Sequence, residues 1–155
     1  MNKTNFLYIT QDKEFQKLKA IPRHGCTNTF AHSEHVAAYA AQMASFFKVS
    51  PESAYRTALL HDFCLANYTS KSCNHPGFYC FYHPIEAAQN AKRFGLSAKE
   101  LRAIECHMFP LGPIPTSRLG WLIRIADIVA SITETECGIR CIQHIIKNGG
   151  YKTVA

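Results

Sequence analysis

The stretch Arg56-Thr57-Ala58-Leu59-Leu60-His61-Asp62-Phe63 places a histidine and an aspartate side by side in an apolar helical segment. Both side chains can bind a divalent cation, since neutral imidazole and carboxylate are the usual protein ligands for Zn, Fe, Mn and Ni. A carboxylate among leucines costs free energy unless it is compensated, and metal coordination is one of the few ways to offset that cost. The stretch therefore predicts a helical protein with a metal site.

The rest of the chain reads almost wholly as helix, without strand alternation, repeats or low-complexity segments. Ser50-Pro51 is a helix start signal, and Ser97-Ala98-Lys99-Glu100 has the pattern of a capping box. The pattern predicts a loop over residues 65–82 and an all-α fold of about six or seven helices, in a single domain over residues 1–155. The expected helices cover residues 11–19, 28 or 29 to 47, 51 to just beyond 62, 84–93, 97 to before 110, 117–135 and 137–147.

Composition sets wider bounds on what the chain can do. The net charge of +6 comes from 17 basic and 11 acidic residues, which favours anionic partners. The basic residues are scattered, so nucleic-acid binding is only weakly indicated. No segment has the length of a membrane span or the pattern of a secretory signal, and the seven cysteines lack zinc-ribbon spacing. We expect a cytoplasmic protein with reduced thiols and no membrane partner.

Six side chains along the helices are the candidate metal ligands. His83 before Pro84 has an alternative role as a helix N-cap, and His107 has one as a C-terminal histidine favoured by the helix dipole. Asp127 lies in an apolar helical stretch, where it either pairs with Arg124 or holds a metal. His35 competes with the first histidine of the set. The six are His32, His61, Asp62, His83, His107 and Asp127.

The order His…His-Asp…Asp resembles the HD-domain superfamily, whose members are helical and mostly metal-dependent phosphohydrolases. The resemblance covers about residues 23–136, and the matching segments are similar to those of small bacterial HD-domain hydrolases. Ile128 departs from the lysine that close relatives often carry there, and Met108 and the missing Gly-Tyr-Pro signature depart from the cyclic-dinucleotide phosphodiesterases. The matching segments are Asn28-Thr29-Phe30-Ala31-His32-Ser33, Leu59-Leu60-His61-Asp62-Phe63, His83-Pro84, His107-Met108-Phe109-Pro110-Leu111 and Ala126-Asp127.

The resemblance implies two divalent transition-metal ions, each of which could be Fe, Mn, Ni, Co or Zn. One ion would be held by the residues at 32, 61, 62 and 127 and the other by those at 83 and 107, with Asp62 bridging both. The expected function is hydrolysis of a small phosphate ester by a metal-bound hydroxide, and a nucleotide is one candidate substrate. His61 and Asp62 would be catalytic through the metals.

Further cations near the metals would bind the anionic substrate. Arg23 and His24 lie upstream of His32, Lys71 lies in the predicted loop, and Arg124 lies one helical turn before Asp127. His24 is also the candidate leaving-group acid. These four residues are the predicted substrate contacts, although each except Arg124 could equally be a solvated surface residue.

Two other functions fit the same residues. Some HD-domain proteins, among them myo-inositol oxygenase, use this six-ligand pattern to hold two irons and activate O₂. A non-catalytic domain that binds metal or another ligand for regulation is the third reading, and an intact ligand set argues against it. The sequence does not predict the substrate, the identity and number of the bound metals, the oligomeric state or the roles of the cysteines.

Overall fold

A computed structural model describes residues 6–23, 27–65 and 79–147, and these residues form helices without any strand. The predicted all-α fold of six or seven helices is therefore confirmed, with α1 to α7 and two short 3-10 helices, η2 and η3. The elements are α1 Leu7–Thr10, α2 Lys13–Gln16, η2 Lys17–Ala20, α3 Thr29–Met43, α4 Pro51–Leu59, α5 Tyr79–Ala91, η3 Lys92–Phe94, α6 Ala98–Glu105 and α7 Arg118–Lys147.

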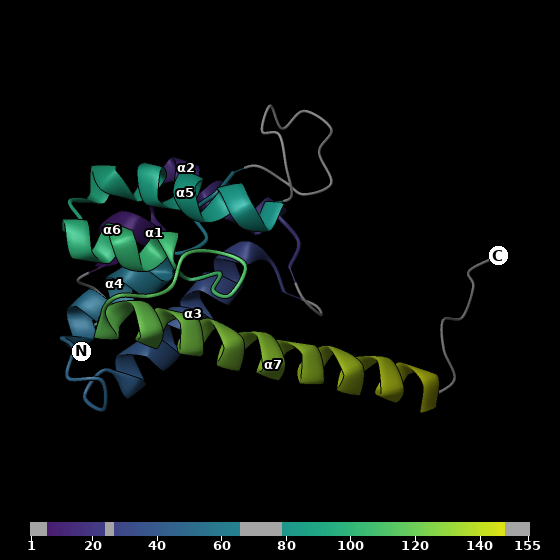
Figure 1. The fold of residues 1–155 in the computed structure, drawn as a ribbon. Helices are drawn as coiled ribbons and strands as arrows, with labels where there is room; N and C mark the ends of the chain where they lie inside the picture. Colours follow the sequence, from purple (N-terminus) through teal and green to yellow (C-terminus); the bar gives the residue numbers. More distant parts are fainter. Residues whose placement is uncertain (1–5, 24–26, 66–78, 148–155) are drawn as a thin grey trace.

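Helix α3 packs against both α4 and α7, while α5 packs on α6 and α6 in turn on α7 (Figure 1). Small residues allow this close approach: Ala37 and Ala40 on α3, Ala58 on α4, and Ala126 and Ala130 on α7 are all buried. Larger buried side chains fill the spaces between the helices, among them Phe15, Phe63, Leu59, Ile104, Leu122 and Ile123. Polar side chains buried in this core, described below, thus lie where bulk water cannot form hydrogen bonds with them.

Helix α4 ends earlier than the sequence predicts. The expected helix ran just beyond Asp62, but α4 ends at Leu59 and His61-Asp62 lie in the following turn. The chain tightens there, because the backbone N–H of His61 donates to the Ala58 carbonyl, three residues back, at 3.3 Å. The side chains of His61 and Asp62 consequently point to one place instead of diverging by the roughly 100° of a regular helix.

Other predicted helix boundaries were also wrong. The helix expected to reach residue 47 ends at Met43, and the segment expected over 11–19 is α2 followed by η2. Pro84 lies inside α5 rather than at its start, and Tyr79 to Tyr82, expected in a loop, are helical. A proline in a helix loses one hydrogen bond, and here the buried Pro84, Ala87 and Ala91 pack the helix into the core. His83 is therefore not a helix N-cap. The two helices expected over 117–135 and 137–147 are one continuous helix, α7, in which Gly138 is tolerated at a cost of about 1 kcal/mol.

A buried carboxylate fixes α4 to α6, the helices after which His61 and His107 follow. The Glu100 carboxylate accepts hydrogen bonds from Arg56 Nε at 2.6 Å and Nη2 at 2.7 Å, from Ser53 Oγ at 2.7 Å, and from the backbone and hydroxyl of Ser97. The Ser97 contacts complete the predicted capping box of α6. Although burial by itself raises it, hydrogen bonds from Arg56 and Ser97 lower the pKa of Glu100 from its ordinary 4.5 to about 2.

Glu100→Gln is expected to lower the free energy of unfolding by about 2 kcal/mol at neutral pH, since it removes charge-assisted hydrogen bonds. The folded-state pKa is depressed, so this stabilisation is present above pH 4.5 and is lost as the pH falls toward 2. Urea unfolding of the two proteins at pH 7 and pH 3 would measure it. An equal difference in unfolding free energy at both values would contradict the assignment.

Within the described ranges no helix is both long and apolar enough to span a bilayer, although α7 has the length. Cys64, Cys80, Cys106 and Cys137 form no disulfide in the structure.

Candidate metal centre

Asp62 lies at the centre of a group of imidazole and carboxylate side chains that come from five helices or the turns after them. Its side chain is fully buried, and so are those of His32 from α3, His61 after α4 and His107 after α6. His83 on α5 and Asp127 on α7 are exposed by only 1% and 5%. The six candidate ligands, distant in sequence, are thus assembled in one buried cluster.

One carboxylate oxygen of Asp62 faces the first half of this cluster. Asp62 Oδ2 lies 3.3 Å from His61 Nε2 and 3.7 Å from His32 Nε2. Asp127 Oδ1 completes the group at 3.1 Å from His32 Nε2 and 3.8 Å from His61 Nε2. Ligand atoms about 2.1 Å from one cation stand about 3.0–3.4 Å apart, so two of these four separations match those of a coordination sphere and the other two are a few tenths of an ångström longer.

The other oxygen of Asp62 faces the second half. Asp62 Oδ1 lies 3.4 Å from His83 Nε2 and 3.5 Å from His107 Nε2, and the two Nε2 atoms are 3.1 Å apart. A single carboxylate thus stands between two sets of ligand atoms. Two groups of three side chains have metal-binding spacing and share His61: His32, His61 and Asp127 form one, and His61, Asp62 and His107 form the other.

The opposite ring nitrogen of each histidine is held by an oxygen. Nδ1 lies 2.7 Å from the Ala58 carbonyl in His61, 2.8 Å from the Tyr79 carbonyl in His83 and 2.7 Å from the Ile104 carbonyl in His107. A carbonyl oxygen can only accept, so Nδ1 of each of these three rings carries a proton, and Nε2 is the atom that each ring presents to the cluster. The histidines are therefore oriented as metal ligands usually are.

This arrangement leaves polar atoms that the protein itself does not satisfy. His61 Nε2 and Asp62 Oδ1 are buried without a hydrogen bond, whereas Asp62 Oδ2 forms an ion pair with Arg23. The Nε2 atoms of His83 and His107 face each other. Burial together with His61 and His83 lowers the pKa of His107 to about 4, so a proton between the two rings is disfavoured. A cation on each side of Asp62 would satisfy all of these atoms, and the residues present therefore fit a metal pair.

Charges within the cluster compensate one another. Although burial raises it, Arg23 and His61 hold the pKa of Asp62 well below its usual range, with Arg23 Nη2 2.6 Å from Asp62 Oδ2. Burial lowers the pKa of His61, but Asp62 and Asp127 outweigh it and raise that pKa to about 10. Asp62 is therefore ionised throughout the physiological pH range, as a metal ligand must be.

Glu134 is the site residue that the sequence analysis missed. Its buried carboxylate lies on α7 two helical turns after Asp127, with Oε2 2.9 Å from His32 Nδ1 and Oε1 2.8 Å from His35 Nδ1. The signal was the spacing of seven residues, which returns to the same helix face. His35 is half exposed and contacts Oε1 of this carboxylate. Of the two competing histidines, the buried His32 is therefore the one that belongs to the cluster.

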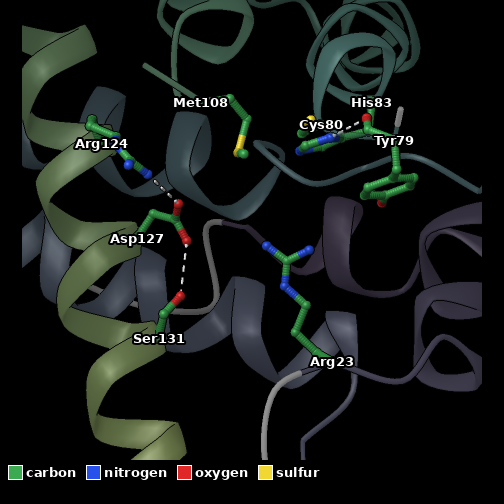
Figure 2. A pocket seen from close by; sticks show the side chains of 8 residues that line it. All are labelled: Arg23, Tyr79, Cys80, His83, Met108, Arg124, Asp127 and Ser131. Atoms are coloured by element: carbon green, nitrogen blue, oxygen red, sulfur yellow. Dashed lines mark hydrogen bonds and ion pairs between the residues drawn. The ribbon is translucent and has the colours of Figure 1, made fainter. Parts of the chain in front are cut away.

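A cavity of about 470 Å³ opens onto the cluster, and Figure 2 shows the side chains that line it. The guanidinium of Arg23 points into the space between Asp127 on α7 and the pair Tyr79 and His83 on α5. The ring of Tyr79 stacks on that of His83 with centroids 4.4 Å apart. The lining consists of Arg23, Tyr79, Cys80, His83, Met108, Arg124, Asp127 and Ser131.

Of the four predicted substrate contacts, the structure places two at this cavity. Arg23 and Arg124 both line it, and Arg124 Nη1 lies 3.4 Å from Asp127 Oδ2. Asp127 thus contacts Arg124 through Oδ2, as one of the two predicted alternatives has it, and His32 of the buried cluster through Oδ1. His24 and Lys71 lie outside the described residues.

Comparison with known proteins agrees with this geometry. No curated protein and no solved structure matches the chain. The family model for the HD domain matches residues 29–132, which include all six candidate ligands. HD domains bind divalent metals and are generally hydrolases. Because the match spans well over half of its length, the chain belongs to the HD-domain family.

Proposed function

We propose that this protein is a divalent-metal-dependent phosphohydrolase that acts on a small phosphate ester, such as a nucleotide. The observation that carries the proposal is the position of Asp62, whose two oxygens face two separate sets of ligand atoms. One bridging carboxylate between two sets of ligands is the arrangement that two-metal hydrolases use.

One metal ion would be held by His32, His61, Asp62 and Asp127, and a second by Asp62, His83 and His107. When bound, two such ions supply Lewis acidity toward phosphoryl oxygens and lower the pKa of a coordinated water. The chain's own contribution is to aim the four Nε2 lone pairs and to keep both aspartates ionised.

Arginine side chains would bind the anionic end of the substrate. Arg23 and Arg124 line the cavity from opposite sides, and each is already oriented by an aspartate of the cluster. A guanidinium matches the geometry of phosphate oxygens through paired N–H donors. Tyr79 and Met108 line the same cavity and would contact the organic part of the ester. His24 and Lys71 remain predicted contacts, with His24 as the proposed leaving-group acid.

The size of the cavity agrees with a small substrate. Its 470 Å³ lies within the range of about 300–1,000 Å³ that small-molecule sites occupy. A mononucleotide or sugar phosphate could enter such a space, whereas a polymer would have to pass along it. This supports a small ester rather than a nucleic-acid strand.

The test is the metal content of protein purified without chelators, followed by a panel of phosphate esters. We expect about two transition-metal ions per chain and phosphatase activity that a chelator abolishes. His83→Ala should retain about one ion, because it removes a ligand of the second set alone. If both ions were iron and turnover required O₂, the oxygenase reading would replace this proposal. Metal without any turnover would favour a regulatory domain.

A further inference from the structure

The outer face of α7 carries an apolar stripe that the metal centre does not use. Side chains at alternating steps of four and three residues lie along it, and all are exposed or partly exposed. Ile132 and Ile139 are exposed by 54% and 50%. We name this stripe the isoleucine seam, and it consists of Trp121, Ile125, Ile128, Ile132, Thr135 and Ile139.

The seam lies on the side of α7 opposite to the buried core. Ala126, Ala130 and Glu134 face the core and are buried, and they lie about half a turn of the helix away from Ile128 and Ile132. A partner bound on the seam would therefore leave the core-facing side of α7 in place. In the described part of the chain no other helix covers the seam, since its isoleucines remain exposed.

Alternating steps of four and three residues are the spacing of a coiled coil, in which apolar side chains of one helix enter gaps between those of another. A globular core does not require this strict spacing on the solvent side of a helix. The sequence continues the same steps beyond Ile139, with isoleucine at 142 and again at 146. The spacing of the seam therefore fits a partner helix that has the same repeat.

We propose that the isoleucine seam binds a second copy of this chain, so that two α7 helices pair along their outer faces. The copy itself supplies a helix with the required repeat. In an antiparallel pair Ile128 of one copy lies opposite Ile139 of the other, and Ile132 lies opposite Thr135. Each layer of the seam then meets another layer of the same seam, as the two-fold symmetry of a homodimer requires.

The shape of α7 agrees with this partner. Its C-terminal part extends past the other helices of the molecule (Figure 1). A helical segment of this length without tertiary contacts is only marginally stable in water. In the antiparallel pair each extending part lies along the part of the partner's α7 that is held by its own core, and both gain cover.

The area available is sufficient for a specific dimer. From residue 121 to residue 147 the helix is about 40 Å long, and covering half of its circumference buries on the order of 600 Å² on each copy. Together the two copies reach about 1,200 Å², the lower end of the range for specific interfaces. Pairing along the whole of α7 is therefore needed.

Sedimentation velocity on the full chain tests the proposal. The wild-type protein is expected at twice the 17.4 kDa of one chain. Ile132→Glu/Ile139→Glu places charges in the seam and should weaken self-association at least about 100-fold. Both positions are exposed and lie away from the metal centre, so the metal content should not change, and this readout is independent of the hydrolase proposal.

Ile114→Glu is the matched control, since Ile114 is exposed by 58% but lies in the connector before α7. It should leave the dimer intact. A wild-type monomer at all accessible concentrations would overturn the proposal. So would a dimer that Ile114→Glu dissociates while Ile132→Glu/Ile139→Glu does not, since that result would place the interface on another face.

Discussion

Asp62→Asn is expected to abolish binding of both metal ions and to lower hydrolysis by about 10³-fold or more. The amide has the shape of the carboxylate but carries no charge, so the set with His83 and His107 keeps no anion and the set with His32 and His61 keeps only Asp127. Losing the metals removes several kcal/mol of stabilisation of the transition-state charge, and about 4 kcal/mol corresponds to 10³ in rate. Mass spectrometry of metal content and steady-state kinetics with the best substrate measure both effects.

Glu105→Gln is the control for this loss of charge, because Glu105 is a partly exposed residue of α6 that, among the described residues, pairs with Arg102 and not with the cluster. It should keep both ions and full activity. Circular dichroism must show that Asp62→Asn is folded before its activity is interpreted. If a folded Asp62→Asn protein still bound two ions, the bridging role of Asp62 would be wrong.

Glu134→Gln is expected to weaken metal binding by about 10- to 100-fold, the range found when an outer partner of a metal-binding histidine is lost. The carboxylate holds Nδ1 of His32 at 2.9 Å and thereby directs Nε2 of that ring at Asp127. The amide can still accept a hydrogen bond, but it no longer makes the imidazole a stronger electron donor. We expect kcat to fall while KM changes little, because Glu134 does not line the cavity.

Glu136→Gln is a closely matched control, since Glu136 is exposed on the same helix two residues further on. Its metal affinity and kcat should equal those of the wild type. Glu134→Asp provides a second comparison: it keeps the charge on a shorter side chain and should restore part of the affinity. Equal affinity in wild type and Glu134→Gln would show that His32 is oriented without this carboxylate.

The all-α fold followed from the sequence because start signals such as Ser50-Pro51 and the Ser97 capping box are local and physical. Helix ends were harder to predict. Nothing in the sequence at Leu60 or His61 breaks a helix, and α4 ends there because the turn that follows brings His61 and Asp62 to the same point. At Pro84 the sequence predicted a helix start where the helix in fact continues. Packing of the buried face of α5 offsets the hydrogen bond that Pro84 cannot form.

The cluster of six candidate ligands could be predicted because two aspartates and four histidines in apolar helices are costly to bury unless they bind a common cation. The structure brings those six together, and it selects His32 over His35 by burial. Glu134 could not be separated from a surface glutamate, because its role depends on the contact between α3 and α7. Contacts between distant segments of this kind are set by packing and are not encoded by local spacing.

The four histidines of the cluster differ in how far a mutation can disturb the oxygen acceptor that orients each ring. His61, His83 and His107 are each held by a main-chain carbonyl three or four residues back, and no side-chain substitution removes that acceptor. His32 depends instead on the side chain of Glu134. Among the ring partners that the structure describes, selection can therefore adjust the metal centre through this carboxylate, while the orientation of the other three rings is protected against sequence change.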